Sequence, residues 1–243
     1  MKNTAKIAFG TLGLLAFAAT ACTPGTGSEA TPTGAVEEDG LPPLGADGQA
    51  PSENLSLEEA APFLEAQGYL PAEGDLNGYE IGYMPDDVEG TPYDLDYTAL
   101  AAAEGQVVPD LHEVERSWLA DTIQVDHLVD DFGEVLPERE AVAVSSLYVS
   151  VMRRDDFTDI DTYHELMGTE MEAEFHDSPA RELPDGNGHY NGSTAIFSPE
   201  SGVVVRVDYV DDAYWAEMDE SDDLTAEGDP EEVLRIVEGI TPA

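Results

Sequence analysis

A chain of 243 residues with 53 acidic side chains, nine basic ones and a single cysteine excludes several classes of protein. A formal charge of −44 repels nucleic acid and anionic lipid headgroups, so neither is expected as a direct partner. One cysteine allows no disulfide within the chain, and a folded domain must then be stabilised by its apolar core.

The first 21 residues predict a secretory signal peptide. Lys2 and Lys6 precede an apolar run from Ile7 to Ala21. This run of about 15 residues is shorter than the ~20 that a membrane-spanning helix needs. We therefore expect residues 1–21 to be removed from the mature protein.

The stretch Ala19-Thr20-Ala21 stands directly before Cys22, the only cysteine of the chain. In an ordinary secreted protein, a cut at this point would leave an unpaired thiol in an oxidising compartment. The same stretch resembles the bacterial lipobox, in which the cysteine receives a diacylglycerol, although Ala19 stands where leucine is commonest. The resemblance implies a lipidated Cys22, and two acyl chains suffice for stable membrane anchoring.

Residues 22–53 are expected to be a lipidated cysteine followed by a disordered tether. It consists mostly of Thr, Pro, Gly, Ser, Glu and Ala, so it cannot bury enough apolar surface to offset its ordering entropy. A flexible segment of this length spans roughly 30 Å on average. Residues 54–243 are then expected to form one extracytoplasmic domain.

Local patterns in the first half of this domain predict two helical and two extended segments. In chain order they are a helix from the capping box Ser56-Leu57-Glu58-Glu59 to about Gln67, a strand over 79–83, one or two helical turns over 100–104, and a strand over 114–119, where a helix is the alternative.

The second half is expected to be mainly antiparallel sheet. Its predicted elements are a strand over 141–152, a helix over 160–167 capped by Asp159, strands over 171–176, 193–197 and 203–210, and a final helix that starts at Asp229-Pro230. In the strand from Val203, Arg206 and Asp208 share one face, which is expected to be wet. Hairpins with helices between groups of strands indicate an α+β fold, an antiparallel sheet packed by a few helices.

Three stretches carry a family resemblance: 78–85, the strand and acidic helix over 141–168, and 231–240. Together they resemble uncharacterised envelope lipoproteins of high-GC Gram-positive bacteria, and they are loosely similar to the extracytoplasmic modules of sigma-factor regulators. The resemblance covers about residues 78–241. It implies a place on the outer face of the cell membrane, and it brings no catalytic residue with it.

Metal and cofactor sites are not expected. The five histidines lack a close metal-ligand spacing and are interpreted as surface residues. The acidic segment 219–230 alternates like an EF-hand loop, but Leu224 replaces its turn glycine and Pro230 its bidentate acid, so a solvated acidic loop is expected.

One segment combines aromatic rings with acids, and such a combination can hold a cation through π faces and carboxylates. The alternative is that these aromatic rings simply pack the end of a strand against the sheet. The residues are Tyr209, Asp211, Asp212, Tyr214 and Trp215.

The sequence favours a non-enzymatic, lipid-anchored protein that binds or senses a ligand outside the membrane, either a cationic ligand or an envelope protein. Nucleophile elbows and phosphate loops do not occur, and a mature chain without lysine excludes lysine-dependent mechanisms. Two alternatives stay open: a carboxylate-dependent hydrolase acting on a cell-wall polymer, and a carrier of an apolar molecule.

Overall fold

The computed structural model describes residues 44, 51–103, 110–130, 134–169, 175, 179–210 and 228–243. The signal peptide, Cys22, nearly all of the tether, and Asp211 to Trp215 lie outside these residues. Within them the α+β class is confirmed, with four helices and a large antiparallel sheet. None of these helices is long and apolar enough to cross a bilayer.

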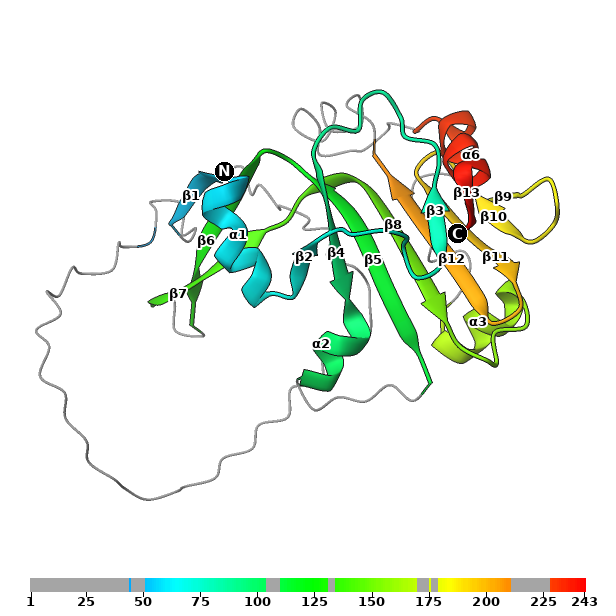
Figure 1. The fold of residues 1–243 in the computed structure, drawn as a ribbon, viewed down its shortest axis with the longest axis horizontal. Helices are drawn as coiled ribbons and strands as arrows, with labels where there is room; N and C mark the ends of the chain where they lie inside the picture. Colours follow the sequence, from blue (N-terminus) through cyan, green and yellow to red (C-terminus); the bar gives the residue numbers. More distant parts are fainter. Residues whose placement is uncertain are drawn as a thin grey trace, which may run out of the picture. The chain divides into compact units, whose positions relative to one another are not determined.

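The large sheet has eight strands in the order β2-β4-β5-β8-β12-β11-β10-β9, and every neighbouring pair is antiparallel (Figure 1). Alternating apolar side chains on its central strands β8 and β12 form the middle of the core. The strands are β2 (Tyr69–Pro71), β4 (Thr91–Asp96), β5 (His112–Leu119), β8 (Ser145–Arg153), β9 (Arg181–Glu182), β10 (Gly188–Tyr190), β11 (Thr194–Glu200) and β12 (Val203–Tyr209).

Two smaller sheets accompany the large one. The first has the order β1-β6-β7 and the second pairs β13 with β3. These strands are β1 (Ser52–Ser56), β3 (Tyr79–Ile81), β6 (Thr122–Val129), β7 (Val135–Val142) and β13 (Ile240–Pro242).

The large sheet and the β1-β6-β7 sheet share one long bent hairpin. Its first strand runs from β5 into β6 through residues 120–121, and its second returns from β7 into β8 through residues 143–144. In Figure 1 these green strands leave the large sheet and continue beside helix α1 (Leu57–Ala66). We call the place where the hairpin changes sheets the joint.

The helices start where the sequence places their caps. Ser56 and Glu59 form the predicted capping box of α1. The side chains of Asp159 and Asp229 accept backbone N–H bonds at the starts of α3 (Ile160–Met167) and α6 (Pro230–Gly239). The remaining described helix is α2 (Tyr97–Ala103).

Three apolar clusters hold these layers together. The first joins one face of the large sheet to α6, β3 and β13, and it includes Val149, Val205 and Ile236, all fully buried. The second lies on the opposite face under α3. The third joins α1 to the β1-β6-β7 sheet and to Tyr93 and Leu119 of the large sheet.

Several expectations are confirmed and others are wrong. Residues 114–119 are a strand rather than a helix, and the predicted helices at 57–66, 160–167 and 230–239 are present. The single strand over 141–152 is wrong, because β7 ends at Val142 and β8 begins at Ser145, where the chain moves from one sheet to the other.

Three further differences concern boundaries and exposure. The strand β1 begins at Ser52, two residues before the expected start of the domain, and the helix expected over 100–104 is α2 at 97–103. The second face of β12 is not wet along its length, because Val204 is fully buried under α3. Of the strand expected over 171–176, only Phe175 is described, and it belongs to no strand.

Candidate functional site

An open hollow of about 340 Å³ lies at the joint. The ends of β5 and β8 form part of its lining, and the loop between β3 and β4 contributes two acids. We call it the joint hollow. Its lining residues are Asp87, Glu89, Trp118, Ala120, Val144, Ser145 and Ser146.

A β-bulge shapes this lining. Ser117 pairs with Tyr148 and Leu119 pairs with Ser145, so two residues of β8 lie opposite Trp118 alone. Ser145 stabilises the irregularity, since its Oγ accepts a hydrogen bond from the Trp118 N–H at 2.9 Å and donates one to a backbone carbonyl of β8 at 2.7 Å. Bulges re-aim side chains and are common next to binding sites.

The loop between β3 and β4 holds both acids beside the bulge. Val88 packs against the first cluster, and its neighbours Asp87 and Glu89 both line the hollow. The hydroxyl of Tyr209, at the end of β12, donates a hydrogen bond to Asp87, at 2.8 Å from Oδ1 and 2.7 Å from Oδ2. The carboxylate of Asp87 is therefore positioned by a side chain of the core.

The charge of the joint hollow is negative. Its lining contains two carboxylates and no basic residue. Val144, which is 46% exposed, contributes apolar surface, while the ring of Trp118 belongs to the first cluster and leaves only 8% of that residue exposed. Elsewhere in the described part of the chain, six of the seven arginines already form ion pairs with acids: Arg116, Arg139, Arg153, Arg154, Arg206 and Arg235. Carboxylates beside apolar side chains suit a cationic group that carries carbon atoms.

A second polar region lies on β5, on the face that also carries the second cluster. Glu115 is only 3% exposed, and its carboxylate accepts hydrogen bonds from Ser117 Oγ at 3.0 Å and from Tyr97 Oη at 3.3 Å. Burial raises the pKa of Glu115 to about 7, and the charges of Asp208 and Glu113 raise it further against those hydrogen bonds.

Glu113 lies two residues earlier on β5, on the same face as Glu115. Burial raises its pKa as well, while a hydrogen bond from Ser150 Oγ at 3.1 Å and the nearby charge of Arg206 lower it. Of the two acids, Glu115, with a pKa of about 7, is the candidate for acid–base chemistry.

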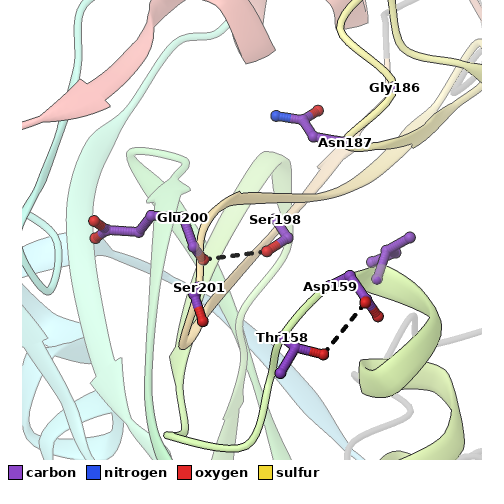
Figure 2. Close-up of a pocket in the computed structure, with 8 residues that line it drawn as sticks. Thr158, Asp159, Gly186, Asn187, Ser198, Glu200 and Ser201 are labelled. Carbon is purple, nitrogen blue, oxygen red and sulfur yellow. Dashed lines mark hydrogen bonds between the residues drawn. The ribbon is translucent and has the colours of Figure 1, made fainter.

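A third feature is a smaller hollow of about 210 Å³ (Figure 2). It lies between the start of α3, the turn before β10 and the turn after β11. Most of its polar groups already serve the fold. Asp159 caps α3, and the Ser198 hydroxyl donates to the Glu200 carbonyl oxygen at 3.2 Å. The Glu200 carboxylate points away from Thr158 and Asp159 in Figure 2 and accepts a hydrogen bond from the Tyr79 hydroxyl at 3.0 Å.

Of the aromatic and acidic segment singled out in the sequence, only Tyr209 is described. Its ring is 4% exposed and packs in the first cluster. Its hydroxyl nevertheless reaches Asp87 of the joint hollow. The other four residues, Asp211, Asp212, Tyr214 and Trp215, lie outside the described residues, as does the EF-hand-like segment up to residue 227.

Sequence reasoning missed Asp87, Glu89 and Trp118. The signal that could have found the acids is their alternation around Val88, but nothing in the sequence connects that alternation with Trp118. Among the described residues, no three His, Cys, Asp or Glu side chains are arranged to hold a metal ion.

No protein-family model, curated protein or solved structure matches this chain.

Proposed function

We propose that this chain is a lipid-anchored protein on the extracytoplasmic face of the cell membrane, whose α+β domain binds a ligand without catalysing a reaction. Cys22 carries the anchor, the segment after it acts as a spacer, and the domain meets its ligand at the joint hollow. The expected partners are the membrane, through the anchor, and a cationic ligand or an envelope protein, with no nucleic acid.

The observation that carries a binding role is the convergence of Asp87, Glu89 and Trp118 in one open hollow. The described lining residues include no histidine, lysine or cysteine, so the two serines lack the serine–histidine or serine–lysine pairing of the common nucleophilic enzymes. Carboxylates beside apolar side chains are suited to recognition.

The anchor is tested by Cys22→Ala in the full chain, with membrane fractionation and metabolic labelling by a palmitate analogue. We expect the wild type to be labelled and membrane-bound, and the variant to lose the label and leave the membrane fraction. A variant that stays in the membrane fraction to the same extent as the wild type would contradict lipid anchoring.

A hydrolase is the second candidate, and Glu113 with Glu115 is the observation that favours it. Their side chains leave the same face of the strand from Cα atoms roughly 6.6 Å apart, so the two carboxyl groups are neighbours, as the paired acids of a glycosidase are. A pKa of about 7 for Glu115 suits a general acid. Against this role, Glu115 is 3% exposed, so a polymer could reach it only after a rearrangement.

Hydrolysis is tested by measuring reducing ends released from purified cell-wall polymer. The binding role predicts no release above the level of a heat-denatured sample. Release that Glu115→Gln abolishes and Glu80→Gln preserves would establish the hydrolase instead, because Glu80 is an exposed acid on β3 outside both regions.

A further inference from the structure

We infer that the joint hollow binds an organic ammonium group, with the Asp87 and Glu89 carboxylates balancing its charge and with Val144, Ala120 and the exposed part of Trp118 contacting its carbon atoms. This inference rests on the proposed binding function, since it names the ligand class of the same site. Three observations support it: the two acids that line one open hollow, the apolar side chains beside them, and the bulge between β5 and β8 that shapes the lining.

The lining favours an organic cation over a metal ion. Calcium takes six to eight oxygen ligands, whereas the hollow offers two acids together with the apolar side chains of Trp118, Ala120 and Val144. An ammonium group that carries methyl or methylene groups can use both kinds of surface, because its charge interacts with carboxylates and its carbons with apolar side chains. An anion would meet two like charges.

The Asp87 carboxylate and the loop that carries Glu89 are held in position before a ligand arrives. A tyrosine hydroxyl donates a single hydrogen, so the Tyr209 bond leaves most acceptor positions of the Asp87 carboxylate available for a cation. Val88 is held by the first cluster, and the close approach of Gly90 to the Leu119 carbonyl fixes the end of the loop. Positioning of this kind lowers the entropic cost of binding.

The experiment uses the mature chain from Cys22, purified in a neutral detergent and labelled with ¹⁵N. The indole N–H signals are followed by NMR during titration with choline chloride and with spermidine, and Trp215→Phe assigns the Trp118 signal. Sodium chloride at matched ionic strength and calcium chloride are the controls. We expect the Trp118 signal to shift saturably with choline or spermidine and with neither control.

Two nearly isosteric variants test the role of the acids. Asp87→Asn can still accept the Tyr209 hydrogen bond, and Glu89→Gln removes only a charge. Each is expected to raise the Kd of the organic cation about fivefold or more, whereas Glu80→Gln, outside the hollow, leaves it unchanged. Thermal melts check that the three variants remain folded.

Three results would overturn the inference. They are a Trp118 signal that neither choline nor spermidine shifts, a shift that sodium or calcium chloride reproduces, and unchanged affinity in both acid variants. None of these results bears on the membrane anchor, which Cys22→Ala tests separately, so the failure of the ligand class and the failure of the anchor can be told apart.

Discussion

The hydroxyl of Tyr209 donates a hydrogen bond to the carboxylate of Asp87, 122 positions away in the chain. Tyr209 ends a central strand of the large sheet, and Asp87 lies in the loop before β4. Because the tyrosine ring is buried in the first cluster, the core of the domain determines where a carboxylate stands at the joint hollow.

Replacing Tyr209 with Phe keeps the ring and removes this bond. We expect the free energy of unfolding to fall by about 2 kcal/mol, since hydrogen bonds to charged groups contribute roughly 1.5–3 kcal/mol. Urea unfolding monitored by circular dichroism measures the change. The control is Tyr93→Phe, a buried tyrosine with no hydroxyl bond among the described residues, and an equal effect in both variants would contradict the assignment.

The raised pKa of Glu115 makes stability depend on pH. Its ordinary pKa is 4.5 and its folded pKa is about 7, so the folded state binds more protons between these values. The stability contributed by this group is fully present below pH 4.5 and is lost as the pH rises through 7.

Relative to Glu115→Gln, the wild type should therefore lose on the order of 3 kcal/mol of stability between about pH 4 and about pH 8. Urea unfolding of both proteins across this range provides the comparison. The variant shares the general acidity of the chain, so any pH dependence common to both proteins is attributed to the other acids. Parallel curves would show that Glu115 titrates normally.

Gly90 lies in the loop that carries Asp87 and Glu89, with φ of 124°, and a Cβ atom there would clash with the Leu119 carbonyl oxygen. Gly90→Ala should cost about 3 kcal/mol or more, combining backbone strain with a displaced loop. Gly74→Ala is the matched control, since its φ is also positive and nothing lies near its Cβ position. Its cost should stay near 1 kcal/mol. Thermal unfolding separates the two.

Arg116 and Asp94 form a bidentate ion pair across β5 and β4, with N–O distances of 2.7 and 2.8 Å and side-chain exposures of 11% and 22%. Arg116→Ala leaves Asp94 without its partner and should cost about 3 kcal/mol. Arg235→Ala removes the pair with Glu232 on α6, in which the arginine is 53% exposed, and should cost less than about 1 kcal/mol. Chemical unfolding tests both, and similar costs would contradict this ranking.

The sequence alone determined the short-range features of the fold. Ser56 with Glu59, and Asp159 with Thr162, lie within one helical turn of each other, so their caps could be predicted without knowledge of the rest of the chain. The alternation from Val203 to Tyr209 likewise predicted a strand with one buried face. The α+β class followed from the order of such segments.

Only the tertiary structure decided the features that depend on distant parts of the chain. The break between Val142 and Ser145 is invisible in an apolar run, because it exists only where one hairpin serves two sheets. From the sequence, Glu115 is indistinguishable from an ordinary surface acid. In the fold, the neighbouring strands and Tyr97 bury it. Asp87, Trp118 and Tyr209 meet because strand pairing joins segments separated by tens of residues, and local sequence patterns carry no record of such contacts.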